Sequence, residues 1–420
     1  MSPGKRGWIK KYFSILVNYK ENLNRYPGAL LSPEELFYAY LQPTGIMYGF
    51  PANLLFLDAK IMKGWSKDET FRVLLLEGLI LVDHLKKGEF DIESLEASLG
   101  RFVEFYEKTQ IERSKKSWLN FKDATVYEKL ESIINQRIDI KTSFSNKLWT
   151  TYLYNSLIFH DLILYDEYHK GHDTHRIKIK REVVALELVK VVAAAAHSGY
   201  EIKEPEKAIF DVFLASADLS KSGRDQARDF WDQKKTLDDI DFKFDRSWAL
   251  NRYILELAVL TVWGDRQVNE AEHQFLNDLT ERLGIAEEEK DASFIAIQSF
   301  VMKNHEAVPY LTGKKDSTLL MDGATERWRN ILGRNKEKLA TELKDSKELL
   351  ALIAKSTTEE LTKEEKEKAK NQLKDLARTI PSLTLFMLPG GSLLLPIILK
   401  IIPDLVPTAF RNNQIDDEEE

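Results

Sequence analysis

Apolar residues recur along most of the chain at the spacing of one helix face. In two segments the three- and four-residue steps are unbroken. The positions are Leu74, Leu75, Leu79, Val82 and Leu85 in the first segment, and Ile254, Leu257, Ala258 and Thr261 in the second. Few segments alternate with period two, and the Asp322-Gly323 pair has helical flanks instead of strand-like ones. The pattern predicts an all-α, multi-helix protein.

Short polar stretches between the periodic segments predict where helical units are joined. These connectors are residues 169–176, 286–290 and 312–325. The final DDEEE run is typical of a solvated acidic tail. The expected organisation is an N-terminal helical region at 1–165, a helical repeat unit at 176–285, a third region at 291–413 and the tail at 414–420.

An internal repeat is visible when residues 186–219 are laid on residues 253–285 at an offset of 66. Each copy is an apolar helix, a short polar turn and an acidic start to a second amphipathic helix. Glu206 then matches Glu272, and Asn269 with Glu272 forms a capping-box pattern. The repeat therefore predicts two similar helical hairpins.

The GDRQVNEAE turn of the second copy resembles the tellurite-resistance TerB-like helical domains, whose turn carries an acidic D-G-x-[IV]-x-x-x-E pattern. The resemblance covers roughly residues 181–285, with Arg266 where the family favours glycine. It implies an acidic metal site, for which Asp265, Glu270 and Glu272 are the candidate oxygen ligands. The alternative is that the two glutamates stabilise the positive end of a helix and Asp265 lies in a turn.

The amino-acid composition limits which kinds of site and partner the chain can have. The 420 residues carry a net charge of −7 and include no cysteine, which excludes disulfides, thiol catalysis and thiolate zinc sites. DNA binding is not expected from an acidic chain, and RNA contact would need a local basic patch. The strongest such patch is ATERWRNILGRNKEKLA, with candidate RNA contacts at Arg327, Trp328, Arg329 and Arg334. The alternative is an exposed helix face crossed by ion pairs.

One histidine cluster, His169, His172 and His175, has the residue types of a transition-metal site. Gly171 interrupts the helix that would place the three on one face, so a connector is the favoured interpretation. The chain has no nucleotide-binding glycine loop, H-E-x-x-H helix or G-x-S-x-G turn. No motif points to an enzyme or to a cofactor, and a catalytic triad dispersed along the chain stays open.

Residues 379–399 carry no charge over 21 positions, which as a helix would measure about 30 Å. Pro381, Pro389, Pro396 and the Gly390-Gly391 pair interrupt this stretch. Two interpretations stay open: a broken membrane span, or short helices buried in the fold. If the stretch inserts, the lysines and Arg378 before it keep the preceding chain in the cytoplasm.

The C-terminal region reads LTKEEKEKAKNQLKDLARTIPSLTLFMLPGGSLLLPIILKIIPDLVPTAF and resembles the leucine zipper–EF-hand transmembrane (LETM-like) family. In that family a charged helix, here capped by Thr362 and Glu365, precedes a proline-punctuated apolar segment. The matching positions that end the motif are Leu394, Leu395, Pro396, Lys400, Pro403, Pro407, Thr408 and Phe410. The Pro389-Gly390-Gly391 break departs from the family pattern, and the chain continues only ten residues past Phe410.

The LETM-like resemblance implies a membrane-associated, non-catalytic protein, because mitochondrial relatives are linked to cation–proton exchange and to ribosome binding. We expect a ribosome-associated protein near a membrane, with its N-terminal bulk in the cytoplasm. The first alternative is a component or regulator of cation–proton exchange, with Lys400 beside a cation path. The second is a soluble helical scaffold. The sequence does not indicate an oligomeric state.

Overall fold

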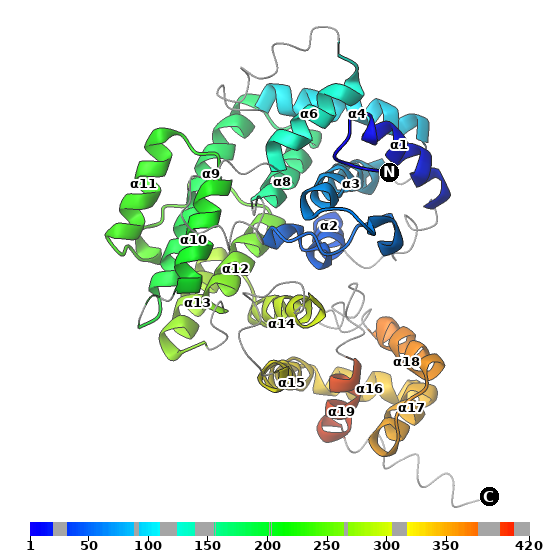
Figure 1. Ribbon diagram of the computed structural model, residues 1–420. Coiled ribbons are helices and arrows are strands. Elements are labelled where there is room, and N and C mark those ends of the chain that lie inside the picture. Colours follow the sequence, from blue (N-terminus) through cyan, green and yellow to red (C-terminus); the bar gives the residue numbers. More distant parts are fainter. Residues whose placement is uncertain are drawn as a thin grey trace, which may run out of the picture. The chain divides into compact units, whose positions relative to one another are not determined.

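The computed structural model describes most of the chain (Figure 1). The described residues are 1–19, 32–87, 92–109, 124–138, 155, 157–200, 202, 204–263, 268–304, 317–376 and 395–406. Within these ranges the regular structure is helical and contains no strand, so the all-α prediction is confirmed. The chain divides into two compact units, residues 1–283 and residues 284–420.

The first part of unit 1 is a group of helices, with short 3-10 turns between the second and the third of them. The helices are α1 (Trp8–Leu16), α2 (Pro33–Leu41), α3 (Lys67–Lys87), α4 (Ile92–Thr109), α6 (Val126–Ile138) and α8 (Ile158–His169). The 3-10 turns are η2 (Gln42–Thr44), η3 (Ile46–Tyr48) and η4 (Ala59–Met62). α3 contains the first periodic segment and packs against α2, α6 and α8, as its apolar spacing predicts.

The second part of unit 1 is organised around α9 (Thr174–His197). α9 contacts α4, α8, α10 (Glu204–Ser216), α11 (Lys221–Asp232) and α12 (Trp248–Val262), and η5 (Leu237–Asp239) and α13 (Glu270–Leu283) complete the set (Figure 1). Its C-terminal half is apolar on nearly every side, with Leu188, Val192 and Ala195 buried. A helix of that composition is a core helix.

The predicted repeat is visible in this second part. α9 with α10, and α12 with α13, form two helical hairpins, and α9 packs on α12. Glu206 and Glu272, matched by the repeat, are each 2% exposed. Gly199, in the turn of the first hairpin, lies so close to α13 that an added Cβ would stand 2.6 Å from Glu272 Oε1.

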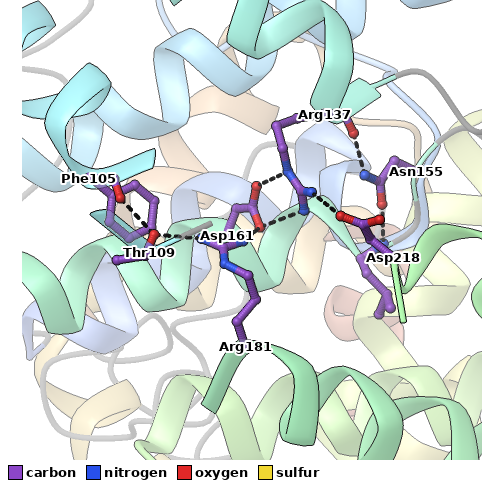
Figure 2. A network of polar contacts seen from close by, with 8 residues as sticks. Phe105, Thr109, Arg137, Asn155, Asp161, Arg181 and Asp218 are labelled. Carbon is purple, nitrogen blue, oxygen red and sulfur yellow. Dashed lines mark hydrogen bonds and ion pairs between the residues drawn. The ribbon is translucent and has the colours of Figure 1, made fainter. Parts of the chain in front are cut away.

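A buried polar network links four helices of unit 1 (Figure 2). Asp161, at the start of α8, accepts Arg137 Nε at 2.7 Å and Arg137 Nη2 at 2.9 Å, and it also accepts Arg181 Nη1. Arg181 of α9 also donates to Thr109 Oγ1 at 3.2 Å, and Arg137 pairs with Asp218 at 3.4 Å. One carboxylate therefore joins α6 and α9 to α8.

Unit 2 contains α14 (Glu287–Asn304), α15 (Ser317–Arg334), α16 (Lys336–Asp345), α17 (Lys347–Thr358), α18 (Lys363–Leu376) and α19 (Leu395–Leu405). α19 packs on α15 and α17, and α17 also packs on α16 and α18. The side chains share one core, built around Trp328, Ile353, Leu373, Ile398 and Ile402. The apolar end of the LETM-like motif is thus part of the core of unit 2.

Two predicted connectors are wrong. Residues 287–290 form the first turn of α14, where Glu287, Glu288 and Glu289 lie at the positive end of the helix dipole. Of the predicted connector 312–325, residues 317–325 belong to α15, and 312–316 lie outside the described residues. The connector at 169–176 is confirmed in its middle, because α8 ends at His169 and α9 begins at Thr174, with Gly171 at φ 83°.

Candidate functional site

α19 presents two different faces. Leu395, Ile398 and Ile402 lie in the core, with exposed fractions of 4% or less. Pro396, Lys400 and Asp404, spaced by four residues, form the exposed face. Pro403 stands in the last turn, so the backbone hydrogen bond that it cannot donate is lost only at the end of the helix. An apolar motif thus becomes an amphipathic core helix that displays one lysine.

Part of the predicted partner and membrane motif can be placed on this helix. Leu395, Pro396, Lys400 and Pro403 belong to α19. The remaining motif residues lie outside the described residues: Pro381, Pro389, Gly390, Gly391, Leu394, Pro407, Thr408 and Phe410. Of the candidate span 379–399, only residues 395–399 are described, and they are in α19. Among the helices that the structure describes, none is both long and apolar enough to cross a bilayer.

α15 brings a second group of candidate residues to α19. Arg329 of α15 lies 3.7 Å from Asp404 of α19, and the two side chains are 53% and 64% exposed. We call Arg329, Pro396, Lys400 and Asp404 the α15–α19 surface. Lys400 has no ion pair among the described residues, so this surface carries two accessible cations and one carboxylate.

The other predicted RNA contacts have mostly structural partners. The guanidinium of Arg327 stands 4.2 Å from the ring centre of Phe294, and Arg334 Nη2 lies 2.6 Å from Asp291 Oδ2. Trp328 is fully buried in the core of unit 2. An indole without an exposed face cannot stack on a base, so Trp328, one of the four candidate RNA contacts, is a core residue instead.

α18 has a capped start and a lysine-rich outer face. Thr362 N–H donates to Glu365 Oε2 at 2.9 Å and Glu365 N–H to Thr362 Oγ1 at 3.3 Å, which is the predicted capping box. Lys355 Nζ, 2.8 Å from Glu365, is the main cause that lowers the pKa of Glu365 to about 2. Lys366 and Lys370 are paired with Glu360 and Glu367 respectively. The charges of α18 therefore largely compensate one another.

The two candidate metal clusters of unit 1 are not assembled in the described residues. His169 Nε2 lies 3.2 Å from Asp83 Oδ1, while His172 and His175 are exposed on the connector and on α9. Glu272 caps α13, because it accepts Asn269 N–H at 2.8 Å, and Asp265 lies outside the described residues. No group of three metal-ligating side chains occurs in the part of the chain that the structure describes.

The family comparison falls on the segment that contains α18 and α19. Residues 361–420 match the family LETM1-like, RBD. The match spans 60 of the 420 residues and confirms the LETM-like resemblance at this end of the chain. No curated protein and no solved structure matches the chain. The TerB-like resemblance of unit 1 stays a prediction.

Within the LETM1-like segment, sequence analysis identified the capped helix and the motif but missed the surface formed with α15. The Arg329–Asp404 contact joins residues 75 positions apart, and no local spacing indicates it. The exposure of Pro396, Lys400 and Asp404 was nevertheless readable, since their four-residue spacing runs between the apolar positions of α19.

Proposed function

We propose that the protein is a non-catalytic factor that associates with ribosomes through unit 2. The observation that carries this proposal is the LETM1-like, RBD match over residues 361–420. The folding of α19 into a shared core supports it, because a compact helical unit holds surface cations at fixed positions. The acidic total charge makes a local contact surface necessary.

The α15–α19 surface is the proposed point of contact with ribosomal RNA. Arg329 is half exposed and only loosely held by Asp404 at 3.7 Å, so a phosphate group can replace that carboxylate. Lys400 is exposed and has no ion pair among the described residues. Both side chains would act as phosphate contacts, which give affinity and salt dependence without sequence specificity.

Co-sedimentation of the full-length protein with ribosomes over a series of salt concentrations tests this proposal. We expect binding at low salt. The Arg329→Gln/Lys400→Gln double variant should bind at least roughly tenfold more weakly and lower the salt slope by about two units, since each phosphate contact accounts for about one unit. Lys221→Gln, an exposed change in unit 1, is the matched control. Absence of binding at low salt, or equal binding by the double variant and the control, would refute the proposal.

Proximity to a membrane is a further part of the proposal and rests on the family resemblance. Because residues 395–399 pack in the core of unit 2, only 379–394 of the uncharged stretch remain available to a bilayer. Sixteen residues in a helix measure about 24 Å, less than the ~30 Å of a hydrocarbon core. We therefore propose peripheral association. Extraction of membranes with alkaline carbonate should release the protein, and retention in the pellet would indicate a span.

A further inference from the structure

Unit 1 has a groove of about 430 Å³ that the proposed function does not use. It lies between α9, the start of α11 and the segment 241–243, and α9 and α11 run side by side (Figure 1). The volume is in the range of small-molecule sites. The lining residues that carry the argument are Ile179, Val183, Leu186, Lys190, Gly223 and Lys243.

The floor of the groove is apolar. Ile179, Val183 and Leu186 follow one face of α9 at steps of four and three residues, and Ile179 is 46% exposed. Across from them, α11 has Gly223, which adds no side chain to the groove. An added Cβ there would stand 3.2 Å from Leu219 Cβ, so the site has little room for a larger residue. An accessible apolar stripe of this kind favours contact with an apolar group.

One end of the groove has an excess of positive charge. Lys190 lies near Lys243 and Lys235, and burial, followed by these two charges, lowers the pKa of its ammonium group. None of the three lysines has an ion pair among the described residues. Arg246 is also close to this end, through its interaction with Glu187.

Carboxylates also lie at the groove, and two of them already accept backbone hydrogen bonds. Glu187 accepts the backbone N–H of Lys243 at 3.0 Å, and burial raises the pKa of its carboxyl group. Glu182, further along α9, accepts the N–H of Ser220 at 2.8 Å. Asp241 is exposed. At the lysine end, Lys190 and Lys243 line the groove together with Glu187 and Asp241. Lys235 and Arg246 lie nearby, with Asp245 as the one further carboxylate, so four cations stand against three carboxylates.

We propose that this groove binds a single-chain amphipathic anion, with its apolar tail along Ile179, Val183 and Leu186 and its carboxylate or phosphate head at Lys190 and Lys243. From Ile179 to Lys190, α9 rises about 16 Å, enough for an extended alkyl tail of medium length.

Isothermal titration of the full-length protein with dodecanoate, below its micelle concentration, tests the site. We expect one binding site and roughly tenfold weaker binding by the Lys190→Gln/Lys243→Gln variant, because half-exposed ion pairs contribute modestly. Ile179→Ser should also weaken binding, while Lys221→Gln, on α11 outside the groove, should not. Circular dichroism of each variant checks that the fold is retained.

Four further probes test the chemistry of the ligand's head group and the source of the ligand. Dodecyl phosphate should bind, and dodecylammonium should bind at least tenfold more weakly than dodecanoate. Equal binding of the cation and the anion, or unchanged binding in the lysine variant, would overturn the proposal. So would binding to phosphatidylglycerol vesicles, or to an acidic helical peptide, without binding of free dodecanoate.

Discussion

Ile398→Ala tests whether α19 is a core helix of unit 2. Ile398 is fully buried, in the same core as Trp328 and Ile353. The substitution deletes three buried carbon atoms, which at about 0.8 kcal/mol each contribute about 2.4 kcal/mol. The cavity that remains adds to this, so we expect a loss of about 3–4 kcal/mol in the free energy of unfolding of unit 2.

Lys400→Ala is the matched control, two residues further along the same helix. Its side chain is exposed and has no ion pair among the described residues, so the expected change is within about 0.5 kcal/mol. Both variants replace a side chain of α19 by alanine and leave the helix propensity similar or improved. A difference in the free energy of unfolding between the two variants therefore measures the effect of burying the side chain.

Trp328 allows unit 2 to be followed separately, because it is the only tryptophan between residues 284 and 420. Fluorotryptophan labelling and ¹⁹F NMR during urea unfolding would give its transition, with Trp328→Phe to assign the signal. Ile398→Ala should lower the urea midpoint of the Trp328 signal. If its midpoint matches that of Lys400→Ala, residues 395–402 do not contribute to the core and the reasoning is refuted.

Three more changes follow from the described contacts. Asp161→Asn should cost about 3–5 kcal/mol at pH 7, because it leaves Arg181 buried without a carboxylate partner and Arg137 with only Asp218 at 3.4 Å. A urea midpoint equal to that of the unchanged protein would contradict this. Burial raises the pKa of Asp161, but both arginines outweigh it and bring it to about 2, so this carboxylate's contribution is full above pH ~4 and fades as pH falls toward 2. Burial and then Arg181 lower the pKa of His160 to about 3, so stability should fall as pH drops from about 6.5 to 3, and His160→Gln should reduce that slope in unfolding series. Thr362→Ala should cost about 1 kcal/mol in unit 2 by removing the α18 cap, with Thr357→Ala, near the exposed end of α17, as the comparison.

Features that depend on neighbours in sequence were predictable. The capping boxes at Thr362 and Asn269 need only a partner three residues away, and both form as expected. The helical periodicity of α3 and α12 also depends only on residues that are close in the sequence. The other features depend on contacts between residues that are far apart in the sequence. Nothing near Trp328 in the sequence shows that its ring would be enclosed by helices that include α19, 67 residues or more away.

The acidic stretch at 286–290 shows how a composition rule failed. A run of glutamates was interpreted as a connector, yet the same residues are favoured in the first turn of a helix. The distinction depends on the apolar residues that follow, of which Phe294, Ile295 and Ile297 are buried. In the candidate RNA patch the aromatic residue, Trp328, stabilises the core. Arg334 pairs with Asp291, while Arg329 stays half exposed beside Asp404.

The close approach of Gly199 to Glu272 limits how the two hairpins could be recombined. A graft of the second turn onto the first hairpin would put an aspartate at position 199, which matches Asp265 in the repeat. Its Cβ would lie 2.6 Å from the carboxylate that caps α13, and its own carboxylate would repel that group. Glu272 would then have to leave the start of α13. A chimaera built from two identical turns would therefore lose a helix cap, and the asymmetry between the copies is a requirement of their packing.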